Sequence, residues 1–180
     1  QYRDVPRSLL LTFGGTDQHD LTRKLLDVVS TPCRKNNIHI SIVTGPGYSH
    51  YDRLNASIAK DPYVSLTHAT GVISKIMEHT DIAITSNGRT VYEMAHMNIP
   101  AIVVPQHQRE KTHSFACEDN GFIALEPYQK GITERVVLAS LQTLLDRSNF
   151  RKKLFDRTTK FDFSQNKRRV TQIIEALLVA

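Results

Sequence analysis

The sequence lacks tryptophan and contains two cysteines, Cys33 and Cys117, which lie far apart and form no C-x-x-C pair. This excludes a disulfide-rich scaffold and a zinc ribbon, and it favours a reduced, cytoplasmic compartment. The eight histidines form no H-E-x-x-H pattern, so we expect no metal site. We also expect neither a membrane span nor a signal peptide, because no apolar run is long enough for the former and no leader pattern is present.

Long runs of one charge are also missing. The chain has 23 Lys and Arg against 18 Asp and Glu, which gives a net charge of +5. Its tightest basic run is Lys167-Arg168-Arg169, and its aromatic residues do not alternate with basic ones. Nucleic-acid binders usually show a denser basic footprint. The charge therefore favours a phosphate-bearing small ligand, and we expect no nucleic-acid partner.

A chain of 180 residues with 40% hydrophobic residues can form a single domain with a proper core. No internal domain boundary, repeat or low-complexity segment interrupts it. The sequence begins at Gln1 without methionine. We expect residues 1–180 to be one domain excised from a longer chain, with an N-terminal portion left out.

Apolar runs and helical periodicities alternate along the chain, which predicts an α/β fold. We expect a Rossmann-like, doubly wound parallel sheet of six strands with helices on both faces. The predicted strands are Ser8–Phe13, Ile38–Thr44, Tyr63–Thr67, Ile82–Ile84, Ala101–Val104 and Phe122–Leu125. The predicted helices are Asp20–Ser30 with Asp20 as N-cap, Tyr51–Lys60, Val72–His79, Arg89–Met97, Lys111–Asp119, Thr133–Leu145, Ser148–Lys160 and Gln165–Leu178.

The stretch Asp81–Gln106 has the order strand, turn, helix, strand. Its small polar turn, Ser86-Asn87-Gly88, should bring backbone N–H groups to the start of a helix, where an anion binds well. Glu93 lies one helical turn beyond Arg89, so it could face the same ligand without touching its phosphates. The plainer alternative is that Glu93 is a solvated helix residue.

A second loop, Gly14-Gly15-Thr16-Asp17, follows the first predicted strand, and glycine there lets the backbone approach an anion. Both loops lie at the carboxyl edge of the predicted sheet, where such folds bind ligands. The segment after the fifth strand adds polar and cationic residues, namely His107, Arg109, Lys111 and His113. Together they favour a phosphorylated ligand. The dinucleotide fingerprint and the Walker pattern are both missing, which argues against hydride transfer and P-loop hydrolysis.

These motifs resemble those of a known family. The loop Phe13–Asp17, the turn and helix start Ser86–Glu93, and the strand Ile99–Pro105 are similar to the C-terminal domain of GT-B fold enzymes. The similarity is greatest to the UDP-sugar hydrolase of pseudaminic acid biosynthesis and the spore-coat polysaccharide proteins. It extends more distantly to the UDP-N-acetylglucosamine transferase of peptidoglycan synthesis. It covers the chain from about Ser8 to the last helix.

The resemblance implies that this domain binds the nucleotide of a nucleotide-sugar, most simply UDP. Gly14, Gly15 and Thr16 would face the diphosphate or the sugar, and Glu93 would bind the ribose hydroxyls. Further binding residues implied by the resemblance are His68 and Ala69 for the base, Ser86, Asn87, Gly88, Arg89 and Thr90 for the α-phosphate side, and Gln106, His107, Arg109, Lys111 and Thr112 for the sugar. The turn departs from the family's usual Gly-Gly-Ser-Thr, and Arg89 could either pair with a phosphate or block the pocket.

The resemblance also implies a function in surface-glycan biosynthesis of the nonulosonic acid type, as part of a glycosyltransferase or a UDP-sugar hydrolase. No cofactor is implied. The catalytic base of such enzymes comes mostly from the N-terminal half, so no catalytic residue is assigned, and we expect the fragment to bind without turnover. Two alternatives stay open. One is an epimerase-like domain, and the other is a non-catalytic scaffold or dimerisation module fused to a sugar-nucleotide synthetase.

Overall fold

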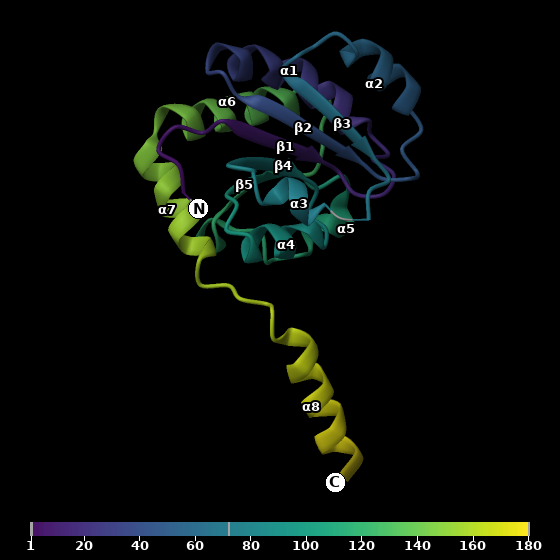
Figure 1. The fold of residues 1–180 in the computed structure, drawn as a ribbon, viewed down its shortest axis with the longest axis vertical. Coiled ribbons are helices and arrows are strands. Elements are labelled where there is room, and N and C mark those ends of the chain that lie inside the picture. Colours follow the sequence, from purple (N-terminus) through teal and green to yellow (C-terminus); the bar gives the residue numbers. More distant parts are fainter. Residues whose placement is uncertain (1, 72, 180) are drawn as a thin grey trace.

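The computed structural model describes residues 2–71 and 73–179. All strand pairings in it are parallel, in the order β3-β2-β1-β4-β5-β6 (Figure 1). The strands are β1 (Ser8–Thr12), β2 (His39–Thr44), β3 (Val64–His68), β4 (Ile82–Thr85), β5 (Ala101–Val103) and β6 (Phe122–Ala124). This is the order of a doubly wound Rossmann sheet, in which the direction of winding reverses between β1 and β4. The predicted fold class is confirmed.

Helices cover both faces of the sheet, with α1, α2 and α6 on one face and α3 and α4 on the other (Figure 1). The helices are α1 (Leu21–Lys35), α2 (Tyr51–Ile58), α3 (Ser74–Met77), α4 (Thr90–His96), α5 (Gln108–Lys111), the 3-10 helix η1 (Glu118–Asn120), α6 (Thr133–Asp146), α7 (Ser148–Thr158) and α8 (Asn166–Val179).

Two hydrophobic cores result, one on each face, and β1 contributes to both. Leu9 and Leu11 belong to the core under α1, α2 and α6, whereas Leu10 belongs to the core under α3 and α4. All three are at most 1% exposed. Successive side chains of a strand point to opposite faces, so a strand buried on both faces needs a continuous apolar run. This is why the uninterrupted leucines predicted a central strand.

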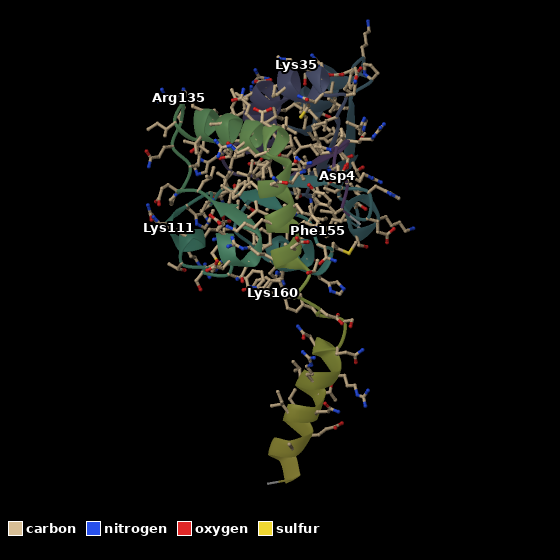
Figure 2. The ribbon with its side chains drawn as sticks, turned by 90° about the vertical axis from the view of Figure 1, so that its left-hand side faces the viewer. Asp4, Lys35, Lys111, Arg135, Phe155 and Lys160 are labelled. Atoms are coloured by element: carbon tan, nitrogen blue, oxygen red, sulfur yellow. The ribbon has the colours of Figure 1, made fainter. Side chains whose placement is uncertain are left out.

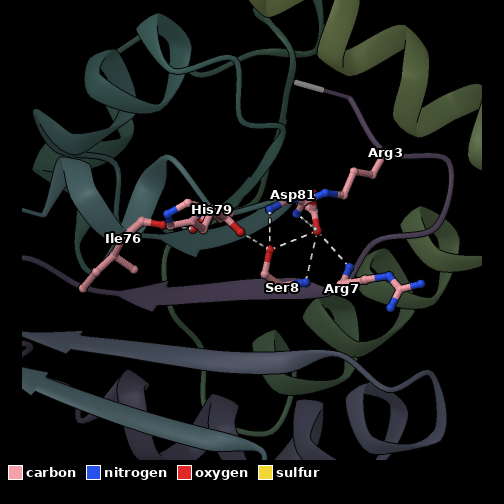
Figure 3. A network of polar contacts seen from close by, with 7 residues as sticks. Arg3, Arg7, Ser8, Ile76, His79 and Asp81 are labelled. Atoms are coloured by element: carbon pink, nitrogen blue, oxygen red, sulfur yellow. Dashed lines mark hydrogen bonds and ion pairs between the residues drawn. The ribbon is translucent and has the colours of Figure 1, made fainter.

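At the amino edge of the sheet, Asp81 joins the segment before β1 to the start of β4 (Figure 3). Its carboxylate accepts hydrogen bonds from the backbone amides of Arg7 and Ser8 at 2.8 and 3.1 Å, and it pairs with Arg3. The hydroxyl of Ser8 lies within hydrogen-bond distance of both the carboxylate and the carbonyl of His79, which share its one hydrogen, and it accepts from the amide of Asp81. This Asp81 network lies at the opposite end of the strands from their carboxyl edge.

The predicted helix Lys111–Asp119 is wrong. The structure has the short helix α5 before it and η1 at its end, with turns and irregular backbone between. The carbonyls of Glu110 and His113, which a continuing helix would need, instead accept hydrogen bonds from the side chain of Asn87. The predicted stop is present, because Gly121 adopts a left-handed φ of 93° after η1.

Two further helices differ in length from the prediction. Helix α1 continues past Ser30 to Lys35, and Pro32 is tolerated in its last turn. The predicted helix Val72–His79 is reduced to α3, and Val72 lies outside the described residues.

Helix α8 stands clear of the rest of the molecule in both views (Figures 1 and 2). Its side chains at Val170, Ile173 and Ile174 are more than half exposed. Within the described ranges, no helix combines the length and apolar character that crossing a membrane requires.

Candidate functional site

A cavity of ≈ 290 Å³ opens at the carboxyl ends of β1, β4 and β5. It lies at the point where the winding of the sheet reverses, which is where doubly wound folds bind ligands. The described residues that line it are Phe13, Gly14, Gly15, Thr16, Gln18, Ser86, Gly88, Arg89, Thr90, Gln106, His107 and Glu110. The structure therefore brings together three segments that are far apart in the sequence.

The glycine loop after β1 is held in place by the loop after β2. A Cβ on Gly45 would lie 2.5 Å from both the Cα and the carbonyl oxygen of Gly15, so the close approach requires glycine. The amide of Gly47 donates to the same carbonyl at 3.0 Å. Gly14 has a φ of 75°, which glycine adopts without strain. The loop thus presents its backbone to the cavity in a fixed conformation.

Asp17 occupies the start of α1. Its two carboxylate oxygens accept hydrogen bonds from the amides of Leu21 and Thr22, each at 2.8 Å, and its side chain is buried. The positive end of α1 is already neutralised by this carboxylate. An anionic ligand in the cavity would therefore depend on another helix.

Asp20 occupies the N-cap position of α1 as predicted, but its side chain makes no capping hydrogen bond. Its carboxylate accepts hydrogen bonds instead from the hydroxyl of Tyr48 at 2.6 Å and from Nε of Arg23 at 2.8 Å. Burial, followed by the hydrogen bond to Asp20, raises the pKa of Tyr48 well above its usual value. These contacts tie the loop before α1 to the loop after β2.

The start of α4 offers the free donors. Across the described part of the chain, the backbone amides of Gly88, Arg89 and Thr90 have no hydrogen-bond partner. All three residues line the cavity, and the side chain of Arg89 is exposed beside them. Unpaired amides at the start of a helix carry partial positive charge, and a guanidinium adds a full one. This side of the cavity, here called the amide wall, suits a phosphate group.

The opposite side of the cavity is formed by the segment after β5, here called the Gln106 wall. The side-chain amide of Gln106 donates to the carbonyl of Phe13 at 3.0 Å, which leaves its Oε1 facing away from that bond. Among described atoms, this buried Oε1 has no partner. The carboxylate of Glu110 accepts from the backbone amide of Gln106 at 2.8 Å. This wall is rich in acceptors and therefore suits a ligand with hydroxyl or N–H groups.

Nine of the sixteen predicted site residues line the cavity, and the other seven lie elsewhere. Glu93 is exposed on α4, one turn beyond the amide wall. Asn87 is buried and points toward the α5 segment. Arg109 is exposed, Lys111 pairs with Glu126 and reaches the surface (Figure 2), and the hydroxyl of Thr112 donates to the carbonyl of Arg109.

His68 and Ala69 lie at the end of β3, two strands away from β1 on the same edge of the sheet. The imidazole of His68 packs against Tyr51 with ring centroids 4.4 Å apart, and its Nδ1 lies 2.9 Å from the hydroxyl of Thr44. Ala69 has a left-handed φ of 51°, and its amide donates to the carbonyl of Thr44. Because the amide of Ala69 is already bonded, a ligand at this residue would contact its backbone through the carbonyl.

Three lining residues were missed by the sequence prediction, namely Phe13, Gln18 and Glu110. Their positions next to predicted loops were a usable signal for Phe13 and Gln18. Glu110 was harder to foresee, because an acidic residue repels a phosphate. In the structure it belongs to the Gln106 wall, where its carboxylate accepts from the backbone amide of Gln106.

The fold and the cavity define a Rossmann-like domain with a candidate ligand site at the carboxyl edge of the sheet. Residues 9–173 match the family model described as the glycosyltransferase family 28 C-terminal domain. The chain belongs to this family.

Curated relatives match part of the chain. It is 29% identical over 108 residues to the uncharacterized protein MJ1062 of Methanocaldococcus jannaschii, covering 58% of this chain and 22% of the relative. It is 26% identical over 112 residues to the spore coat polysaccharide biosynthesis protein SpsG of Bacillus subtilis, covering 61% of this chain and 33% of SpsG.

Among solved structures, MurG of Acinetobacter baumannii superposes with a TM-score of 0.72 at 17% identity, covering 95% of this chain and 50% of MurG. MnaA of S. aureus, solved with UDP, gives a TM-score of 0.72 at 10% identity, covering 97% of this chain and 47% of MnaA. At such identities the likeness concerns the fold. The chain spans half or less of the length of each of these proteins.

Proposed function

We propose that this domain binds the nucleotide portion of a nucleotide-sugar, with UDP as the first candidate, as one half of a glycosyltransferase or sugar-nucleotide hydrolase. The observation that carries the proposal is the cavity with two unlike walls. The unpaired amides of Gly88, Arg89 and Thr90 suit a diphosphate, and the free acceptor of Gln106 suits a hydroxyl-bearing group. Family membership supports the same assignment.

The nucleotide and the pathway are supported by the relatives. MnaA was solved with UDP, and SpsG takes its name from spore coat polysaccharide biosynthesis. The proposed chemistry is attack at the anomeric carbon of the donor with departure of the nucleoside diphosphate, the acceptor being a sugar or water. The amide wall would stabilise the charge that develops on the leaving phosphate. A further half of the protein, as in relatives about twice this length, would supply the acceptor site and the catalytic base.

A thermal-shift panel with UDP, CDP, GDP and ADP tests the proposal. A ligand present at 100 times its dissociation constant adds about 2.7 kcal/mol to stability. At about 2–4 °C per kcal/mol for a chain of this size, the melting temperature should rise by about 5–10 °C. A selective rise with UDP supports the proposal. A flat panel with this domain and with the full-length protein would refute it and leave the scaffold alternative.

Glu93→Ala tests the ribose contact. We expect the variant to lose most of its affinity for UDP, because Glu93 is exposed one turn beyond the amide wall with its carboxylate available to hydroxyl groups. Glu78→Ala is the matched control, since it removes the same charge from an exposed helix end near the amino edge of the sheet. Equal affinities of the two variants in isothermal titration would contradict the assignment of Glu93.

Arg89→Ala decides between the two roles open to this side chain. If the guanidinium pairs with a phosphate, the variant binds UDP more weakly and its affinity depends less on salt. If Arg89 blocks the cavity, the variant binds more tightly. We expect weaker binding, because Arg89 is exposed at the rim and its backbone already belongs to the amide wall.

A further inference from the structure

Asn87 is buried, like its neighbour Ser86, in the turn between β4 and α4, and its side chain points toward the α5 segment. Its Nδ2 donates to the carbonyls of Glu110 and His113 at 2.8 and 2.9 Å. Nδ1 of His113 lies 2.8 Å from the carbonyl of Asn87. We propose that this reciprocal contact, the Asn87–His113 clamp, positions the two walls of the cavity relative to each other and thereby sets the affinity for the ligand.

The hydrogen-bond geometry fixes the roles of all groups in the clamp. A carbonyl oxygen can only accept, so Nδ1 of His113 must carry the proton and donate. Both hydrogens of the Asn87 amide are used by carbonyls, which also fixes the orientation of its side chain. Asn87 itself is 5% exposed, whereas His113 is exposed, so the three hydrogen bonds are partly shielded from water, chiefly from the Asn87 side.

The clamp is continuous with the rest of the cavity. Asn87 directly precedes the amide wall of Gly88, Arg89 and Thr90. Glu110, whose carbonyl it binds, uses its carboxylate to hold the amide of Gln106. Gln106 in turn donates to the carbonyl of Phe13 at the end of β1. One chain of hydrogen bonds therefore joins the segments that follow β4, β5 and β1.

A purely structural contact would stabilise the fold without setting the cavity, and the Asp81 network supplies the comparison (Figure 3). The hydroxyl of Ser8 also makes several hydrogen bonds, at the amino edge of the sheet and far from the amide wall. Ser8→Ala should lower stability and leave ligand affinity unchanged. Asn87→Ala should lower both.

The binding test measures the affinity for UDP by titration calorimetry in Asn87→Ala, His113→Phe and the double variant; it rests on the proposed function. In catalysis a misplacement of about 1 Å can cost about a hundredfold in rate, and displaced binding groups should likewise lose affinity. We expect Asn87→Ala to weaken UDP binding at least about tenfold, and His113→Phe to weaken it less, because phenylalanine removes the ring donor alone. In the Asn87→Ala background, His113→Phe should add nothing, since contacting residues are not additive. Additive losses, or a loss no larger than in Ser8→Ala at matched stability, would overturn the proposal.

A second measurement does not depend on any ligand. Hydrogen exchange reports the amides of Tyr92 in the first turn of α4, of Gln106 and of Glu110, which are all hydrogen-bonded in the structure. Asn87→Ala should accelerate exchange at all three while the strands keep their protection. Acceleration on one wall only, or a uniform change across the sheet, would overturn the clamp. If wild-type protein binds no nucleotide but the exchange result holds, the proposed function fails and the clamp stands.

Discussion

Replacing Asp17 tests how the glycine loop and α1 are joined. The Asp17 carboxylate makes two amide contacts of 2.8 Å, is 4% exposed, and sits on a backbone with a φ of 42°. Loss of an N-terminal cap costs about 0.5–2 kcal/mol, and alanine at a left-handed φ costs about 1–2 kcal/mol more. Asp17→Ala should therefore cost about 3 kcal/mol.

Two companion variants separate these contributions. Asp17→Gly removes the cap without the backbone penalty and should cost about 2 kcal/mol. Asp17→Asn tolerates the left-handed backbone and keeps one acceptor, so about 1 kcal/mol is expected. Asp27→Ala is the control on the same helix, because its side chain is 69% exposed and its ion pair with Arg23 is loose at 3.9 Å.

Equilibrium urea unfolding of the four variants measures the free energies directly. The order of stability should be Asp27→Ala above Asp17→Asn, then Asp17→Gly, then Asp17→Ala. If Asp17→Gly and Asp17→Ala are equally stable, the left-handed backbone carries no cost. If the free energy of unfolding of Asp17→Ala lies within about 0.5 kcal/mol of wild type, the carboxylate does not cap α1. The amides of Leu21 and Thr22 would then be available to a phosphate.

Two further predictions concern Gly45 and Cys33. Gly45→Ala should destabilise the domain by about 1–3 kcal/mol and loosen the glycine loop, because the added Cβ would meet the backbone of Gly15 at 2.5 Å; denaturant unfolding measures it, and a neutral result would contradict the close approach. Burial raises the pKa of the Cys33 thiol to about 12, so the native state holds its proton more tightly than the unfolded chain. The associated stability is present below about pH 9 and is lost as the pH rises toward 12. Cys33→Ala should show a shallower decline in stability over that range, and an equal slope would refute this assignment.

The strands were predictable because their signal is local. A strand buried on both faces of a parallel sheet needs a continuous apolar run, and β1 has one with a glycine-rich turn after it. Strand and helix patterns alternate along the chain, and this alternation is compatible with few sheet topologies. The same logic placed Gly14, Ser86 and Gln106 at one edge of the sheet, and the structure brings all three into the lining of the cavity.

The direction in which each polar side chain points was not predictable, because it depends on partners that are distant in sequence. Asp17 and Asp20 stand three residues apart before the same helix, and either could have capped it. The difference lies in Tyr48, in a loop 28 residues away, whose hydroxyl donates a hydrogen bond to the carboxylate of Asp20. Arg151 likewise lies in a helix rich in basic residues, yet it is 1% exposed because its guanidinium donates to the carbonyls of Leu144 and Asp4.

Asn87 shows what this means for the site. Its place in a polar turn before a helix suggested a ligand contact, and a glycine would normally suffice for such a turn. In the structure its side chain donates to the carbonyls of Glu110 and His113, in the irregular segment that replaces the helix predicted from Lys111. The clamp and the missing helix thus involve the same segment, 110–113. This segment has irregular backbone beside the ligand cavity, and the buried side-chain amide of Asn87 holds it in place opposite the amide wall.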